Sequence, residues 1–320
     1  MDVQLRLELF GAYSVSLQAG AWPAQRSLVL NGRLGGLLAL LALGRGQTLN
    51  RGELCRELWG AGPESASAAC FNTLLWRLRR ALELPPDTAA IIETDRQGGV
   101  RIARHVQVQS DLERYLALVE KPLAKPVEQL TPPDVQALRE AVLLYRGDVL
   151  AGYQDDWALR LRERHRRTQL GALARLMHLS SLQGHWPEAI QHGEAMLDMD
   201  ALREDVHREL MRCHLAAGQR ALALTQFERC RSALKRELAI APMAETLALY
   251  QEIAREATQP ATAPVPLAPP RRGLFEPHAL PCLAATPAQV LLPWSEALMQ
   301  ARWHLAQADA QLQTQLDFGH

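Results

Sequence analysis

The stretch Arg45–Leu84, RGQTLNRGELCRELWGAGPESASAACFNTLLWRLRRALEL, decides the fold of this chain. It predicts a short helix, a turn that contains glycine and proline, and a longer helix that ends in the sequence RLRR at 77–80. Two helices joined by such a turn are typical of a helix-turn-helix, whose second helix can enter the major groove of DNA.

The sequences on either side of this stretch predict a winged helix. Alternating apolar residues over 3–30 predict a small antiparallel sheet, and a helical pattern begins at Gly32. Asn50 is suited to cap the second helix, and Ser65 or Ser67 to cap the third. Downstream, the apolar pairs at 91–92 and 100–102 flank Gly98-Gly99 and predict a closing hairpin. We therefore expect a winged-helix DNA-binding domain of the α+β type over 1–106.

Residues from about Asp111 onward predict helices only, including helices near 134–146 and 156–183. Gly184 and Gly218 are 34 residues apart, and Ala189 and Ala223 repeat the same spacing. A period of about 34 residues with small residues where paired helices cross is typical of tetratricopeptide repeats. We expect a tetratricopeptide-like domain over 107–257, so that the chain is mainly α-helical.

The C-terminal part of the chain predicts a linker and one more helix. Residues 258–288 are rich in proline and small residues, which predicts an extended linker. Residues 289–320 predict a single amphipathic C-terminal helix, whose apolar residues include Leu298, Trp303, Leu305, Leu312 and Leu316.

Composition excludes several classes of protein. The first residues alternate in polarity and do not resemble a signal peptide, and no apolar run approaches the roughly 18 residues of a membrane span. Five scattered cysteines predict no disulfide framework, so we expect a cytoplasmic protein. Net charge is zero, but residues 1–106 hold 12 arginines against nine acidic residues. The predicted winged helix is therefore the positive part of the chain.

No sequence pattern predicts catalysis, and we expect no enzyme. The chain contains no GxxxxGK[ST], HExxH, GxSxG or CxxC motif, so neither a cofactor nor a metal ion is expected. Cys213, His214 and Cys230 could suggest a metal site, but their places on repeat helices favour ordinary core thiols. Histidines 165, 178, 185, 192, 207 and 214 are expected at the surface of the helical domain.

The third predicted helix has two distinct faces. On a helical wheel, Phe71, Leu75, Leu78 and Leu82 form an apolar stripe that should pack on the core. The opposite face should meet DNA, with Thr73 and Arg77 at base edges and the terminal arginines at bases or phosphates. The candidate DNA-binding residues of the helix and hairpin are Asn72, Thr73, Trp76, Arg77, Arg79, Arg80, Arg96 and Arg101.

Each of these candidates also has a simpler interpretation. Arginines at a helix C-terminus complement the helix dipole without any ligand. Trp76 could pack against another domain, and Arg96 and Arg101 could simply be solvated.

Taken in series, these segments resemble a bacterial family of transcriptional activators. The chain is similar to the antibiotic-regulatory-protein (SARP) class, in which an OmpR-like winged helix precedes a bacterial transcriptional activation domain of tetratricopeptide type. The similar segments cover about residues 3–256 in the family's order. They are LRLELFGAYSVSL, LLALLALGRGQTLNRGELCRELW, LLWRLRRALEL, AVLLYRGDVLAGY, DDWALRLRERHRR, GHWPEAI, LMRCHLAAGQRALALTQFERCRSALKRELAIAP and ETLALYQEI.

The resemblance implies a sequence-specific regulator that binds repeated sites in double-stranded promoter DNA, often as side-by-side protomers. It further implies contact with RNA polymerase and its sigma factor, an activating role, and a homodimer as a further assembly. By the same resemblance, the base-reading positions are Thr73, Arg77 and Arg79–Arg80.

A different class of function stays open beside this one. The chain could be a tetratricopeptide-type interaction scaffold whose winged helix has lost DNA binding. The small, uncharged run Ala66–Cys70 at the start of the third helix and the zero net charge favour that alternative.

Overall fold

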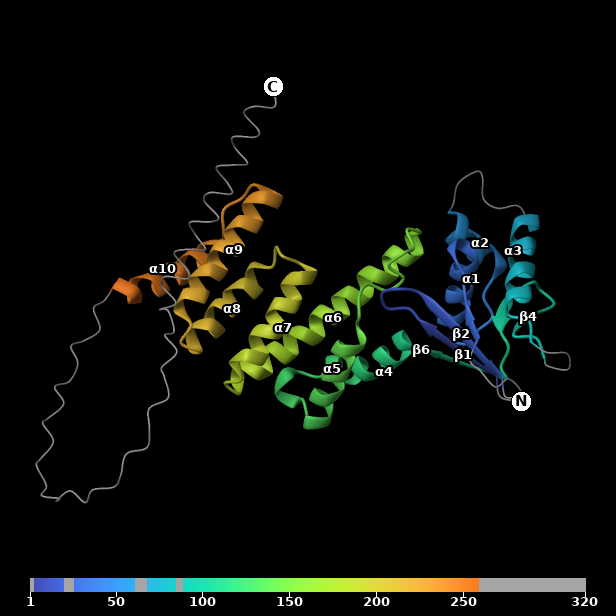
Figure 1. The fold of residues 1–320 in the computed structure, drawn as a ribbon, viewed down its shortest axis with the longest axis horizontal. Coiled ribbons are helices and arrows are strands. Elements are labelled where there is room, and N and C mark those ends of the chain that lie inside the picture. The colour runs from blue at the N-terminus through green and yellow to red at the C-terminus, as the bar shows by residue number, and fades with distance from the viewer. Residues whose placement is uncertain (1–2, 20–25, 61–67, 85–88, 259–320) are drawn as a thin grey trace, which may run out of the picture. The chain divides into compact units, whose positions relative to one another are not determined.

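The structure, a computed structural model, describes residues 3–19, 26–60, 68–84 and 89–258. Its first part is the expected winged helix, and its second part is a series of antiparallel helices (Figure 1). The linker predicted over 258–288 and the helix over 289–320 lie outside the described residues apart from Thr258, as do the candidate caps Ser65 and Ser67. No helix in the described ranges is long and apolar enough to span a membrane.

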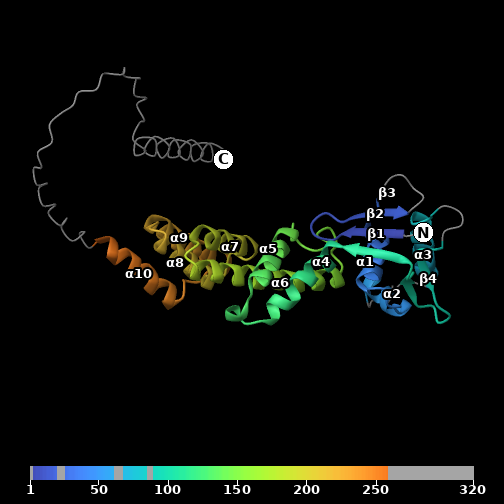
Figure 2. The same ribbon diagram turned by 90° about the horizontal axis from the view of Figure 1, so that it is seen from below.

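A four-stranded sheet forms one layer of the winged helix. Its strands β1 (Val3–Glu8), β2 (Ser14–Ala19) and β3 (Arg26–Leu28) pair antiparallel, as the alternating sequence predicts. The fourth strand, β6 (Val106–Ser110), pairs parallel with β1, which the sequence analysis did not anticipate. Helices α1 (Gly32–Leu43) and α2 (Arg51–Trp59) lie on one side of this sheet (Figure 2).

The remaining elements of the winged helix are the third helix and the hairpin. Helix α3 spans Ala68–Ala81, and strands β4 (Ile92–Thr94) and β5 (Val100–Ile102) form the hairpin. The predicted cap of α2 is confirmed, because the Asn50 side chain accepts a hydrogen bond of 2.7 Å from the Gly52 amide.

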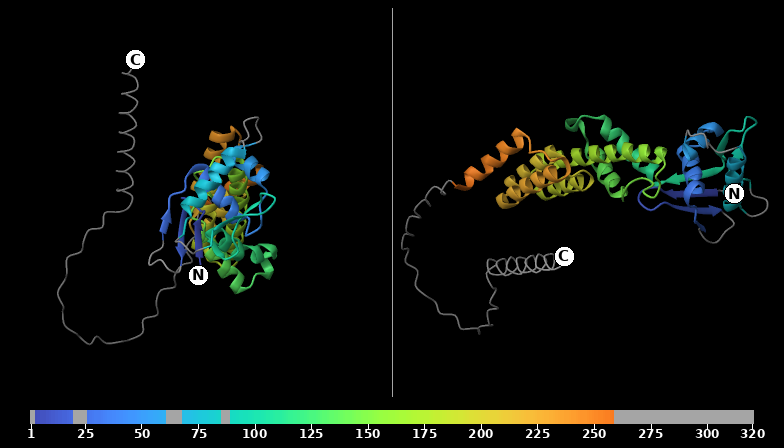
Figure 3. Two further views of the ribbon diagram at one scale, coloured as in Figure 1. Left: turned by 90° about the vertical axis from the view of Figure 1, so that its right-hand side faces the viewer. Right: turned by 90° about the horizontal axis from the view of Figure 1, so that it is seen from above.

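The helical part begins directly after β6. Its elements are α4 (Asp111–Ala124), a short 3-10 turn (Val127–Gln129), α5 (Pro132–Leu144), α6 (Asp156–Leu182), α7 (Trp186–Met199), α8 (Glu204–Ala216), α9 (Arg220–Leu238) and α10 (Ala244–Thr258). From α6 to α9, each helix packs beside the next (Figure 3).

The 34-residue repeat corresponds to the helix pairs α6–α7 and α8–α9. Gly184 and Gly218 occupy the turn of each pair with φ of 72° and 75°, a left-handed conformation that glycine adopts without strain. Ala189 and Ala223 are fully buried where the helices cross. The predicted tetratricopeptide arrangement is confirmed in both copies.

The winged helix and the first helices of the second part share one hydrophobic core. This core contains the buried residues of the sheet and of α1–α3, and it continues without interruption into Tyr115, Leu138, Trp157 and Ala158 of the helical part. Two smaller clusters lie further along the repeats, one around α6–α8 and one around α8–α10.

Helix α1 carries a glycine pair at the centre of this shared core. The Tyr13 hydroxyl donates a hydrogen bond of 3.1 Å to the Gly35 carbonyl, and the Tyr13 ring meets the Tyr153 ring edge to face at 5.7 Å. A methyl group at Gly35 would overlap the Tyr153 hydroxyl and the Leu30 carbonyl oxygen. Burial raises the pKa of Tyr153 to about 12 and that of Tyr13 further still, so both phenols stay neutral.

The loop before α6 is also fixed to the end of β1. The Leu150 amide donates to the Leu9 carbonyl at 2.7 Å, and the Gly11 amide donates to the Asp148 carbonyl at 3.0 Å. The carboxylate of Asp111, at the start of α4, accepts hydrogen bonds from the Leu9 and Phe10 amides at 2.8 and 3.1 Å. The sheet and the helical part are therefore joined by backbone hydrogen bonds as well as by apolar packing.

We predict that Gly35→Ala lowers the free energy of unfolding by about 1–3 kcal/mol, because overpacking of a tight core costs about that much. Gly36→Ala is the matched control. A methyl group there would lie 3.2 Å from a Leu58 methyl and 3.5 Å from the Trp157 ring, and alanine favours the helix by up to about 1 kcal/mol. Urea denaturation of both variants measures the difference, and equal midpoints would contradict the assigned contact.

Candidate nucleic-acid interface

Helix α3 packs on the core through the stripe that its sequence predicts. Phe71 and Leu78 are fully buried, and Leu75 and Leu82 are nearly so. The burial of these four residues fixes the rotation of the helix about its axis. The expected orientation of α3 is confirmed.

The opposite face of α3 is polar, basic and exposed. Trp76 has 60% of its surface exposed, so it does not pack on another part of the described chain. The Arg80 guanidinium carbon lies 5.9 Å from the centroid of the Trp76 ring, within cation–π range. No hydrogen bond or ion pair within the described residues holds the Arg77 guanidinium. The exposed candidates on this face are Asn72, Thr73, Trp76, Arg77, Arg79 and Arg80.

Two of these side chains already have partners in the chain. Arg79 donates a hydrogen bond of 2.6 Å to the Thr94 hydroxyl, which connects the end of α3 to the hairpin. The Thr73 hydroxyl donates to the Ala69 carbonyl at 3.0 Å, so its methyl group is the part best suited to contact a base.

The hairpin is shaped by the residues of its turn. The Asp95 carboxylate accepts hydrogen bonds from the Gln97 and Gly99 amides at 2.9 and 2.8 Å, and Gly98 has a φ of 82°. A side chain at Gly99 would collide with Thr48, which precedes α2. Leu49 forms a backbone bridge with Val100, so the hairpin is held against the segment between α1 and α2.

The two candidate arginines of the hairpin differ in their surroundings. Arg96 lies in the turn, is exposed and has no hydrogen bond or ion pair within the described residues. Arg101 lies on β5 and binds the Glu93 carboxylate through two nitrogens, at 2.9 and 2.6 Å. Glu93 therefore neutralises Arg101, whereas no carboxylate of the described residues pairs with Arg96.

A hollow of about 660 Å³ lies beside α3 and contains residues that sequence reasoning missed. Arg33 and Trp59 contribute to its wall together with the predicted residues Thr73 and Arg77. Arg33 lies in the first turn of α1, and Trp59 is the last residue of α2. No local pattern in the sequence therefore places them beside α3. The described residues of the hollow are Asn31, Arg33, Leu34, Trp59, Ala69, Cys70, Thr73, Leu74 and Arg77.

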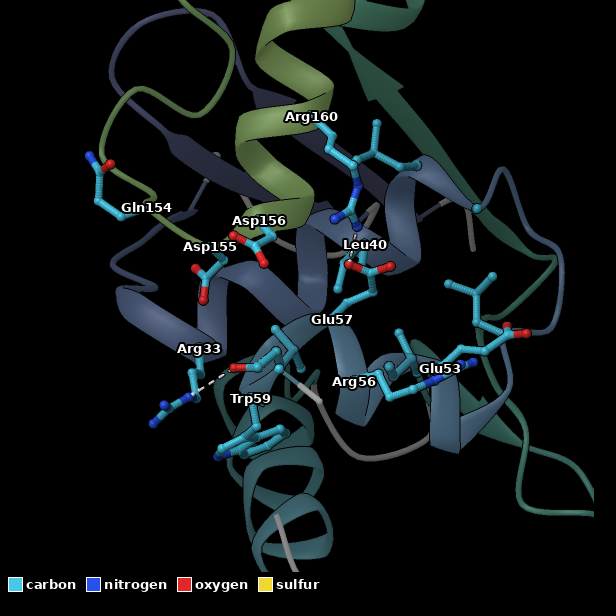
Figure 4. A pocket seen from close by; sticks show the side chains of 16 residues that line it. Arg33, Leu40, Glu53, Arg56, Glu57, Trp59, Gln154, Asp155, Asp156 and Arg160 are labelled. Atoms are coloured by element: carbon cyan, nitrogen blue, oxygen red, sulfur yellow. Dashed lines mark hydrogen bonds and ion pairs between the residues drawn. The ribbon is translucent and has the colours of Figure 1, made fainter. Parts of the chain in front are cut away.

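A second cavity, of about 850 Å³, lies between α1 and α2 on one side and the start of α6 on the other (Figure 4). Its rim mixes both signs of charge, and Arg160 on α6 pairs with Glu57 on α2 at 2.7 Å. Both side chains are substantially exposed, so this ion pair contributes little to stability. The shared apolar core, and not this pair, holds α6 to the winged helix.

Cys213 and Cys230 are buried in the core of the repeats. No group of three or more His, Cys, Asp or Glu side chains suited to a metal ion occurs in the described ranges. Burial raises the pKa of Cys213 and that of Cys230, the latter to about 11, so both are neutral thiols.

The expectation that the six histidines lie at the surface is wrong for three of them. His165, His207 and His214 are buried. His207 contacts the Gln226 side chain and the Ala201 carbonyl, and His214 contacts the Gln219 side chain. Burial lowers the pKa of His165 to about 4, so its imidazole is neutral in the folded chain. The sequence pattern does not distinguish these buried positions from surface positions.

Comparison with known proteins identifies both parts of the chain. A family model for the C-terminal domain of transcriptional regulatory proteins matches residues 25–102, and a model for the bacterial transcriptional activator domain matches residues 110–254. Both models describe transcriptional regulators, not enzymes. The chain belongs to the SARP class of transcriptional regulators.

Two curated relatives align with most of this chain. The regulatory protein AfsR of Streptomyces coelicolor is 30% identical over 219 residues, which are 68% of this chain and 21% of AfsR. The transcriptional regulatory protein MoaR1 of Mycobacterium tuberculosis is 24% identical over 221 residues, which are 69% of this chain and 71% of MoaR1. This SARP-class chain thus spans about a fifth of AfsR and most of MoaR1.

A solved structure has a similar fold. Mycobacterium tuberculosis EmbR, determined in complex with a low-affinity phosphopeptide, superposes with a TM-score of 0.59. Its sequence is 19% identical, and the match covers 79% of this chain and 66% of EmbR. The similarity supports the order of a winged helix followed by tetratricopeptide-like helices.

We predict that Arg96→Ala weakens DNA binding, whereas the double variant Arg101→Ala/Glu93→Ala changes it by less than twofold. A free arginine that contacts a phosphate adds about 0.9 to the slope of log affinity against log salt, so Arg96→Ala should reduce that slope by about this amount. The double variant should have little effect because Arg101 and Glu93 cancel each other's charge, whereas Arg101→Ala alone would leave the Glu93 carboxylate unpaired. Salt titrations by fluorescence anisotropy test the pair, and an equal loss in both variants would contradict the assignment.

Proposed function

We propose that the chain is a sequence-specific transcriptional activator that binds repeated promoter sites. Residues 1–106 bind DNA in this proposal, and residues 107–257 contact RNA polymerase and its sigma factor or a second protomer. The observation that carries the DNA-binding part is the exposed face of α3, where Trp76 and three arginines stand opposite a fully packed apolar stripe.

Some residues on this face are suited to contact bases, and others are suited to contact phosphates. Arg77 and Thr73 lie one helical turn apart, and Arg77 is free to form two hydrogen bonds with guanine while the Thr73 methyl can meet thymine. Arg80 and Trp76 can contact the backbone beside them. Arg79, held by Thr94, positions the hairpin and keeps amino groups for a phosphate.

The proposed activating role rests on the second domain. Its match to the bacterial transcriptional activator domain supports contact with the transcription machinery. Stacked helix pairs offer an extended surface of the kind that binds other proteins. The shared core supports a fixed geometry, in which the repeats are held at a defined place relative to bound DNA.

A selection from a random-sequence duplex library, followed by mobility shifts at moderate salt, tests this function. The proposal expects enrichment of one sequence, present as a direct repeat, and a retarded complex that a scrambled duplex does not compete away. The absence of any sequence-selective complex would favour the alternative, a tetratricopeptide-type scaffold with a degenerate winged helix.

Arg77→Ala is predicted to lower affinity for the selected duplex by about 1–3 kcal/mol and to relax specificity at one base step. The loss should be concentrated at that step, because each correct bidentate contact discriminates against the wrong base. Arg231→Ala on α9 is the control, since it removes the same charge from an exposed site on the repeats. A repeated selection with each variant measures specificity, and an unchanged preference for Arg77→Ala would show that α3 is rotated differently on DNA.

A further inference from the structure

Arg33 is held in one orientation by two contacts at the end of α2. Its Nε donates a hydrogen bond of 3.1 Å to the Leu58 carbonyl, and its guanidinium carbon lies 5.3 Å from the centroid of the Trp59 ring. The side chain is nonetheless exposed, and its two terminal amino groups have no partner within the described residues. The guanidinium is therefore ordered before any ligand arrives.

Helix α1 gains nothing electrostatically from this residue. Arg33 lies in the first turn of α1, a turn that contains no acidic residue. A cation in the first turn opposes the helix dipole, so an arginine at this place is unfavourable for the helix by itself. Such a departure from local preference is expected where a residue serves a ligand.

Arg33 lines two hollows, and the one beside α3 favours an anion. Arg33 and Arg77 line the same hollow beside α3, and no carboxylate is among its described residues. Arg33 also lines the neighbouring cavity at the start of α6, but that cavity contains Glu53, Glu57, Asp155 and Asp156 and therefore does not favour an anion (Figure 4). The terminal amino groups of Arg33 are thus the second cationic group of a concave surface that also contains Thr73.

We infer that Arg33 binds the DNA phosphate backbone in this hollow, beside the bases that Thr73 and Arg77 contact. The inference rests on the proposed DNA-binding function and adds a residue from α1 to the interface. Trp59 and the Leu58 carbonyl are positioning groups, because they hold the guanidinium and reduce the rotamer entropy that binding would otherwise cost. The fork of an arginine suits a phosphate through two parallel hydrogen bonds.

Salt dependence distinguishes a phosphate contact from a base contact. The full chain and its Arg33→Ala variant are titrated with two probes, the duplex selected by the wild-type protein and a scrambled duplex of equal length. We expect Arg33→Ala to weaken binding of both duplexes by a similar factor, about five- to tenfold, and to reduce the salt slope by about 0.9. The ratio of the two affinities should stay unchanged.

Three further variants show whether an effect comes from the charge of Arg33, from the shape of its side chain or from a change in folding. Arg33→Gln keeps a polar side chain without charge and should lose the same slope, whereas Arg33→Lys should keep most of the slope. Arg56→Ala removes an exposed arginine of α2 that lines the other cavity, and it should leave both affinities and the slope unchanged. Thermal unfolding of each variant confirms that it is folded at the assay temperature.

The possible outcomes are distinct. An unchanged slope in both Arg33→Ala and Arg33→Gln would overturn the inference while leaving DNA binding intact. A loss on the selected duplex alone would also overturn it, because Arg33 would then contact a base. Failure of the wild-type chain to bind either duplex would instead contradict the proposed function itself.

Discussion

The close approach of three aromatic residues to helix α1 is the constraint on which the rest of the structure depends. Tyr13 from the turn between β1 and β2, Tyr153 from the loop before α6, and Trp157 from the first turn of α6 meet at the glycine pair Gly35-Gly36. A side chain at Gly35 would overlap the Tyr153 hydroxyl and the Tyr13 ring, so a larger residue there would disrupt the contact between the two parts of the chain. Helix α1 in turn contacts α2 and α3, so the packing that joins the two parts also sets the position of the proposed DNA-binding face.

Electrostatics explain how a chain with zero net charge can present a nucleic-acid surface. Several arginines outside the α3 face are neutralised by nearby carboxylates, as in the pairs Arg101–Glu93 and Arg139–Glu188. Arg33, Arg77 and Arg96 have no such partner within the described part of the chain, and all three lie on the winged helix. Local pairing, more than total composition, determines where an anion can bind.

The sequence predicts the structure correctly where a local spacing of residues determines it. The stripe Phe71, Leu75, Leu78 and Leu82 fixes the rotation of α3, and the 34-residue spacing of small residues locates the two helix pairs. In contrast, β6 was missed because its parallel pairing with β1 joins segments about 100 residues apart. Arg33 and Trp59 were missed for a similar reason, since only tertiary packing brings the ends of α1 and α2 beside α3.

The surroundings of the buried histidines and of Arg101 likewise depend on tertiary packing and could not be predicted from a local pattern. His165, His207 and His214 are buried, although residue type alone favours the surface for a histidine. Whether Arg101 is available to DNA depends on its cross-strand neighbour Glu93, and that neighbour follows from the register of the hairpin. Such properties require the pairing of strands and helices, which a single sequence does not determine.

The central claim is that the exposed face of α3, with the hairpin and the start of α1, is the surface that binds DNA. Hydrogen–deuterium exchange of the full chain, measured with and without the selected duplex, tests it most directly. The account predicts slower amide exchange in α3, in the hairpin β4–β5 and in the first turn of α1, with little change in α8 and α9. Slower exchange confined to the repeat helices, with none in α3, would contradict it.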